Sequence, residues 1–260
     1  MIGNSMVSVF AKSALVRPVP DSYVHCVRTS TEKINVELAK VQHRFYCEAL
    51  QSLGLRLLWA ERDDSLPDSC FVEDTAFIVN ETAVICNMSV ESRAPEVVGV
   101  AEVLKELKRT TCITRPGTID GGDVLKTENK VFVGLTARTN QEAIDQIRRI
   151  FKNRNLKVIP VKVRNVLHLK SACTYLGNNY VILSKGSFDT RILSGLNRIV
   201  VPKAEKYAAD CLAVNGTVLM ARGHPRTKKL IENEGFPVVE LDMSEFKKGD
   251  GALTCLSIIF

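Results

Sequence analysis

The residues best suited to chemistry lie in loops that are far apart in the sequence. Cys255 stands where a charged, glycine-bearing stretch changes into an apolar segment, and His168 precedes another apolar segment. A thiol and an imidazole can act together as a nucleophile and its proton shuttle. Each also has an ordinary structural explanation, because buried cysteines and packed histidines are common in protein cores. The pair indicates a thiol-nucleophile enzyme only if the fold brings the two loops together.

Two further loops carry carboxylates. Asp68, Glu73 and Asp74 lie in one of them, and Asp120 lies in an Asp-Gly-Gly-Asp stretch in the other. Such residues are also common in plain turns and caps. If they converge, they form an anionic pocket, which suits a cation such as a guanidinium that donates paired hydrogen bonds to carboxylates. A cysteine protease would instead need oxyanion donors, and no evident loop supplies them.

The elements that must position these loops follow a repeated order. Strand, strand, helix and strand recur five times, in units of roughly 40–55 residues. Helices are predicted near residues 37–53, 95–107, 139–152, 187–196 and 225–234, with N-terminal strands at 7–10 and 14–17 and a closing strand after Cys255. The pair Asn215-Gly216 is typical of a two-residue hairpin turn.

A repeat of this length favours a radial array over one open sheet. We therefore expect an α/β fold in which five ββαβ units form a pseudo-symmetric propeller, as a single domain over residues 1–260. A doubly wound sheet is the alternative. In a propeller, the loops after the last strand of each unit occupy equivalent places around the axis. The four polar loops would then meet at one centre.

Composition and charge limit the kinds of partner and the cellular location to be expected. The chain of 260 residues is 45% hydrophobic and 25% charged, and its net charge of +6 is spread without a basic block, so neither nucleic-acid nor membrane binding is indicated. Eight cysteines without a C-x-x-C pair favour reduced thiols and a cytoplasmic location. The basic, acid-poor N-terminus weakly resembles an organelle presequence, so an organellar location stays open.

Five stretches together resemble dimethylarginine dimethylaminohydrolase, a family within the guanidino-group-modifying superfamily. They span residues 66–74, 119–125, 133–140, 167–171 and 250–255. They occur in the family's order and at similar spacing, and the resemblance runs from about residue 14 to the C-terminus. It implies a five-unit, pentein-like α/β propeller, in agreement with the repeat count.

The resemblance also implies catalytic roles. Cys255 would attack the guanidinium carbon of Nω-methylated arginine and form a covalent thiouronium intermediate. His168 would protonate the departing methylamine or dimethylamine and then activate the water that releases citrulline. Asp120 and Asp74 would bind the guanidinium nitrogens, and Glu73 would support the site.

The remaining implied roles concern the amino-acid end of the substrate. Asp68 would contact the α-amino group, and Arg93 and Arg138 would clamp the α-carboxylate. Val27 and the pair Gly249-Asp250 would contribute mainly backbone contacts. Gly249 replaces a bulkier apolar residue of the family, so we expect a looser pocket wall there.

Two other functions remain compatible with these residues: an arginine or other guanidino deiminase, and a non-catalytic protein that binds methylated arginine. The chemistry requires no metal or organic cofactor. The expected partner is the small-molecule substrate, with no nucleic acid and no membrane, and the protein is expected to be a monomer or homodimer.

Overall fold

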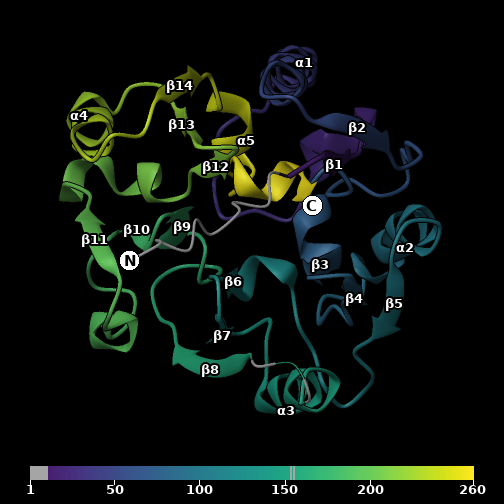
Figure 1. The fold of residues 1–260 in the computed structure, drawn as a ribbon. Coiled ribbons are helices and arrows are strands. Elements are labelled where there is room, and N and C mark those ends of the chain that lie inside the picture. Colours follow the sequence, from purple (N-terminus) through teal and green to yellow (C-terminus); the bar gives the residue numbers. More distant parts are fainter. Residues whose placement is uncertain (1–10, 153, 155) are drawn as a thin grey trace.

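The computed structural model describes residues 11–152, 154 and 156–260, which form five separate three-stranded sheets around a central axis (Figure 1). The sheets comprise β15 (Ile258–Ile259), β1 (Ser13–Val16) and β2 (Arg56–Trp59); β3 (Ala76–Val79), β4 (Thr82–Ile85) and β5 (Arg109–Cys112); β6 (Val124–Lys126), β7 (Lys130–Leu135) and β8 (Lys157–Lys162); β9 (Cys173–Gly177), β10 (Tyr180–Leu183) and β11 (Asn197–Val200); and β12 (Leu212–Val214), β13 (Thr217–Ala221) and β14 (Val238–Leu241).

All five sheets share one topology. The first strand pairs antiparallel with the middle strand, and the middle strand pairs in parallel with the third. A parallel pair needs a crossover, which a helix usually supplies. The predicted five-unit propeller is confirmed. The doubly wound alternative is wrong. It requires one continuous sheet, whereas the described chain forms five separate sheets of three strands each.

Four of the predicted helices are confirmed as crossovers, and they lie on the outer rim in Figure 1. They are α1 (Val36–Ser52), α2 (Val97–Lys105), α3 (Gln141–Ile150) and α4 (Pro225–Asn233). Asn35 caps α1 by accepting the N–H of Leu38 at 3.1 Å. Gly54 follows the helix with a φ of +86°, where glycine carries no steric penalty.

The helix predicted over residues 187–196 is wrong. A four-residue 3-10 turn, Thr190–Leu193, makes this crossover instead. The Asp189 carboxylate accepts the N–H of Arg191 at 3.0 Å, and Gly195 ends the segment at a φ of +88°. Short polar side chains that bond their own backbone compete with an extended helix, which explains the shorter turn.

The C-terminal stretch differs from the prediction in two ways. A short helix, α5 (Ser244–Lys248), replaces part of the predicted final loop, because Phe246 packs into the core against α1. Cys255 lies in a 3-10 turn, Thr254–Leu256, and the closing strand is only β15.

β15 pairs with β1, so the last strand completes the sheet that the first strand begins. The ring is thereby closed by hydrogen bonds between the two ends of the described chain. The strand predicted at 7–10 lies outside the described residues. The hairpin turn at Asn215-Gly216 is confirmed, with φ values of 48° and 86°.

The apolar core is divided into five clusters rather than one. Several of the buried polar side chains lie instead in the loops between units, among them Asp68, Asp120 and His168. None of the described helices has the length and apolar character needed to cross a bilayer.

Candidate active site

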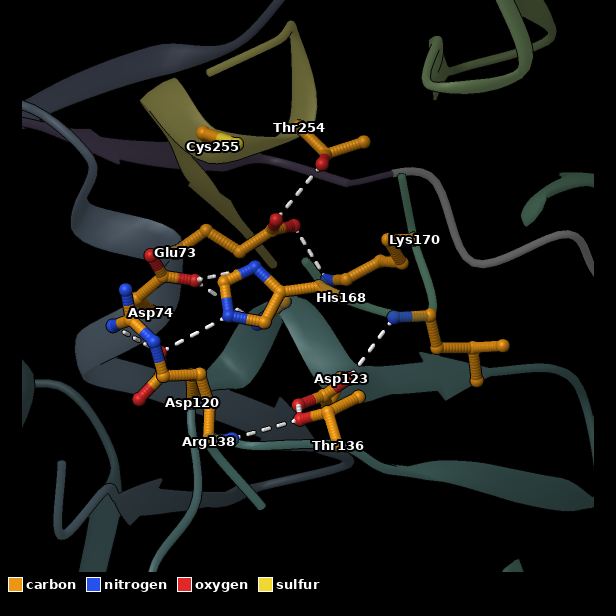
Figure 2. Close-up of polar contacts among 12 residues, drawn as sticks. Glu73, Asp74, Asp120, Asp123, Thr136, Arg138, His168, Lys170, Thr254 and Cys255 are labelled. Atoms are coloured by element: carbon orange, nitrogen blue, oxygen red, sulfur yellow. Dashed lines mark hydrogen bonds and ion pairs between the residues drawn. The ribbon is translucent and has the colours of Figure 1, made fainter. Parts of the chain in front are cut away.

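Loops from four units meet in one buried polar cluster, as the sequence predicted (Figure 2). The turn Val72–Thr75 carries Glu73 and Asp74, Asp120 follows β5, and His168 follows β8. Thr254 and Cys255 lie in the turn before β15. Hydrogen bonds and ion pairs connect all four loops.

His168 is held between two carboxylates. Its Nε2 atom lies 3.0 Å from Oδ2 of Asp120, and its Nδ1 atom lies 3.7 Å from Oδ1 of Asp74. Burial lowers the pKa of this imidazole, but Asp74, the hydrogen bond to Asp120 and the nearby Asp123 outweigh burial and raise it to about 9. The histidine is therefore cationic at neutral pH and able to donate a proton.

Asp120 is fully buried, and only one of its two carboxylate oxygens has a hydrogen-bond partner among the described residues. Oδ2 contacts His168 and, at 3.2 Å, Nη1 of Arg138. Oδ1 is buried without a hydrogen-bond partner in the described part of the chain. Buried carboxylate oxygens almost always have partners. This oxygen is therefore free to accept a hydrogen bond from a donor that enters the site.

The two glycines of Asp120-Gly121-Gly122-Asp123 are required by close packing. A Cβ on Gly122 would stand 2.7 Å from Nδ1 of His168 and 2.8 Å from Oδ1 of Asp74, and one on Gly121 would overlap the carbonyl of Glu73. Only glycine lets this turn lie flat against the imidazole.

Asp123 is a structural residue of the site that was not among the residues predicted from the sequence. Its carboxylate accepts the hydroxyls of Thr136 and Thr139, each at 2.7 Å, and the N–H of Leu169 at 2.9 Å. It thereby fixes the loop after His168 to the loop that carries Arg138. Its position in the Asp-Gly-Gly-Asp stretch was the available signal.

Glu73 connects the nucleophile's turn to the histidine's loop. Oε2 accepts the Thr254 hydroxyl at 2.8 Å, and Oε1 forms an ion pair with Lys170. Burial raises the pKa of the Glu73 carboxyl, and Lys170 opposes that shift. Neither Lys170 nor Thr254 was predicted to have a role, because their partner lies about a hundred or more residues away.

Cys255 is partly exposed, and its Sγ atom accepts the N–H of Ala252 at 3.4 Å. Burial raises the pKa of the thiol well above its usual value, and Asp210, Glu73 and Asp74 raise it further. In the ligand-free site the cysteine is therefore a neutral thiol. A cation placed among these carboxylates would lower the thiol pKa.

The structure places the two predicted clamp arginines against carboxylates of the protein. Arg93 is only 3% exposed, and it bonds Asp74 at 2.9 Å and Glu96 at 2.8 and 3.0 Å. Arg138 reaches Asp120, as described above.

Asp68, Val27 and Asp250 lie at a second set of contacts. The N–H of Val27 donates to both Asp68 oxygens, at 3.2 and 3.0 Å, and Arg93 lies 4.0 Å from the same carboxylate. Asp250 accepts the N–H and the hydroxyl of Thr29 through its side chain. Asp68 thus has one edge of its carboxylate already occupied by backbone.

The looser wall expected at Gly249 is wrong. A Cβ at this position would overlap the Tyr23 hydroxyl and stand 3.3 Å from Sγ of Cys26. Tyr23 is fully buried, and its hydroxyl donates to the carbonyl of Glu245 at 3.3 Å. The tyrosine therefore fills the space that a larger side chain would take.

Asp74, Asp120 and His168 each offer one possible metal-ligand atom, and these atoms lie within 4.8 Å of one another. A histidine must be neutral to bind a metal. The raised pKa of His168 works against that state. We therefore interpret these three side chains as two carboxylates that stabilise an imidazolium.

Fold and site together define a five-unit α/β propeller with a cysteine, a histidine and several carboxylates at its centre. The family model described as "N,N dimethylarginine dimethylhydrolase, eukaryotic" matches residues 20–258. The chain belongs to the dimethylarginine dimethylaminohydrolase family, as its sequence motifs predicted.

Individual relatives agree. N(G),N(G)-dimethylarginine dimethylaminohydrolase of Streptomyces coelicolor is 36% identical over 252 residues, covering 95% of this chain and 96% of the relative. The enzyme of the same name from Pseudomonas aeruginosa is 35% identical over 222 residues, covering 84% and 87%. A crystal structure of the Pseudomonas aeruginosa enzyme, a cysteine-to-serine mutant complexed with citrulline, matches with a TM-score of 0.92 at 31% identity, covering 96% of this chain and 100% of that one.

Proposed function

We propose that this protein hydrolyses Nω-methylated arginine, such as asymmetric dimethylarginine or monomethylarginine, to citrulline and dimethylamine or methylamine. The observation that carries the proposal is the orphan Oδ1 of Asp120, a buried anionic acceptor beside a cationic His168 in a member of this family. A guanidinium N–H is a donor of matching charge. Asp74 provides the second carboxylate for the same group.

The first half of the reaction uses Cys255 and His168. Binding of the guanidinium favours loss of the thiol proton to solvent, and the electron pair of the resulting thiolate forms a bond to the guanidinium carbon. The bond from that carbon to the methylated nitrogen breaks, and imidazolium His168 gives its proton to the leaving amine. The product of this half is a thiouronium bound to Cys255 and a neutral His168.

The second half reverses the role of His168. The neutral imidazole takes a proton from water as the water oxygen attacks the thiouronium carbon. The bond between carbon and sulfur then breaks and its electron pair returns to the sulfur of Cys255. The hydroxyl proton of the adduct passes to that sulfur, which releases citrulline and restores the thiol. The imidazolium is regenerated, and its carboxylate partners Asp74 and Asp120 stabilise it.

The remaining predicted contacts belong to the same proposal. Asp68 binds the substrate α-amino group, and Arg93 and Arg138 bind its α-carboxylate. The backbones of Val27, Gly249 and Asp250 line this end of the substrate. Glu73 acts through Thr254, because it bonds the residue next to the nucleophile.

We extend the proposal to the whole protein. All five units serve as one catalytic domain over residues 1–260, which acts as a monomer or homodimer. A cytoplasmic location is supported by the eight cysteines, each of which is a thiol outside any disulfide in the described chain.

The test is release of amine and citrulline from asymmetric dimethylarginine and from arginine. The wild type should release dimethylamine, Cys255→Ser should release none, and Cys112→Ser, which changes an exposed cysteine on β5, should match the wild type. Ammonia from arginine, without dimethylamine, would instead make the protein a deiminase. Binding of dimethylarginine without any product would make it a binding protein.

A further inference from the structure

The fourth unit contacts the nucleophile's turn, although the sequence assigned no site residue to it. Asp210 follows β11, just as Asp120 follows β5 and His168 follows β8. In Figure 1 the green segment after β11 leads back toward the yellow C-terminal segment. All five loops that follow a third strand therefore carry a residue with ionisable chemistry.

Two hydrogen bonds join this loop to the turn. The Tyr207 hydroxyl donates to the carbonyl of Gly251 at 2.8 Å, and Oδ1 of Asp210 accepts the N–H of Thr254 at 3.4 Å. The two bonds hold the stretch that leads into Cys255 at both ends. Thr254 is held on its other side by Glu73, so its backbone and its hydroxyl each have a carboxylate partner.

Asp210 is only 4% exposed, and charged or titratable groups surround it. They are Glu73, Lys170, Tyr207, Cys211 and Cys255. Burial and then Glu73 raise the pKa of the Asp210 carboxyl, to about 7. After burial, Asp210 raises the thiol pKa of Cys255 more than Glu73 or Asp74 does.

We infer that Asp210 is a positioning residue for the nucleophile: together with Tyr207 it fixes the turn that carries Cys255, and in its ionised form it disfavours the thiolate. The inference rests on the proposed function only in taking Cys255 as the nucleophile. It gives the fourth unit a role that the substrate contacts leave unassigned.

The two parts of this role are separable by substitution. Asp210→Asn keeps an oxygen that can accept the Thr254 N–H but removes the negative charge. Asp210→Ala removes both. Tyr207→Phe removes the bond to Gly251 and leaves the charge in place. The control is Glu205→Gln, a 9% exposed acid in the same loop that accepts the N–H of Thr227 in α4.

The experiment measures the rate at which iodoacetamide alkylates Cys255 as a function of pH, followed by mass spectrometry of the Cys255 peptide in the full chain. Asp210→Asn should move the profile to lower pH and speed alkylation about threefold at about pH 8–9, where wild-type Asp210 is ionised, because a lower thiol pKa means more thiolate. Tyr207→Phe and Glu205→Gln should leave the profile unchanged.

Turnover of dimethylarginine tests the positioning part. Asp210→Ala and Tyr207→Phe should lower kcat, the former by about tenfold, with KM within about threefold, since the substrate contacts stay intact while the nucleophile is misplaced. Wild-type alkylation in Asp210→Asn together with wild-type kcat in Asp210→Ala would overturn the inference.

Alkylation requires no substrate, so the two proposals can fail separately. A shifted profile in a protein that releases no amine would uphold the role of Asp210 and reject the proposed function. An unshifted profile in an active enzyme would reject the charge effect of Asp210 alone.

Discussion

Nε2 of His168 lies 3.0 Å from Oδ2 of Asp120, while Oδ1 of the same carboxylate has no partner among the described residues. One side chain thus orients the proton donor and presents an acceptor to whatever enters the site. This division explains why a carboxylate is fully buried at the centre of the propeller. It also predicts what happens when the charge is removed.

Asp120→Asn should lower the His168 pKa, because the substitution removes an anion that favours the imidazolium. The alkaline limb of the kcat profile should move to lower pH, and kcat should fall about a hundredfold or more as the general acid is weakened. An NMR titration of the four histidines and a pH profile would measure both effects. Asp145→Asn, on the exposed side of α3, is the matched control. A His168 midpoint equal to that of the wild type would contradict the prediction.

The raised pKa of His168 also makes stability depend on pH. Its folded-state pKa is about 9, compared with an ordinary value of 6.5. Protonation therefore contributes stability that is fully present below 6.5 and is lost as pH rises through 9. The loss is on the order of 3 kcal/mol. Urea unfolding across this window should show a steeper fall for the wild type than for His168→Gln, and parallel curves would refute this assignment.

The architecture was predictable because its signals are local. Apolar residues at the helical period marked α1 to α4, and Asn215-Gly216 marked its turn before any long-range contact was known. The pairing of β15 with β1 was not predictable, since it joins residues more than 200 positions apart. The helix predicted for the crossover near Thr190–Leu193 was wrong for a local reason. Hydrogen bonds from the Asp189 side chain to the nearby backbone favour a short turn over a weak helical pattern.

The site was predictable only in part. Repetition of the units predicted that the loops of Asp74, Asp120, His168 and Cys255 converge, and they do. The bonds that hold them there, from Lys170 and Thr254 to Glu73, depend on side-chain directions that periodicity does not fix. The wall at Gly249 could not be predicted for the same reason, because the Tyr23 side chain fills the space that a larger residue at position 249 would take.

Removal of one partner of the ion pair between Lys170 and Glu73 should destabilise the protein more than removal of both partners. Lys170→Met leaves a carboxylate, which is 8% exposed, without its counterion, at a cost of about 3–5 kcal/mol in the free energy of unfolding. The double variant Lys170→Met with Glu73→Gln should recover much of that loss, since a neutral amide can still accept the Thr254 hydroxyl. Urea unfolding of both variants measures the recovery. A double variant no more stable than Lys170→Met would show that the pair is not the source of the cost.

The close packing of Gly122 against the His168 ring predicts that a single added methyl group disturbs the site. In Gly122→Ala the new Cβ would stand 2.7 Å from Nδ1 of His168, so the imidazole must shift by a few tenths of an ångström or more. Displacement of a proton donor on this scale should lower kcat by up to about a hundredfold, because the reaction depends on alignment. Gly99→Ala in α2 is the matched control: its Cβ would meet nothing closer than 3.6 Å, and it should gain up to about 1 kcal/mol in stability with kcat unchanged. A Gly122→Ala variant that folds and keeps wild-type kcat would mean that His168 tolerates displacement, and that Asp120 alone does not set its working position.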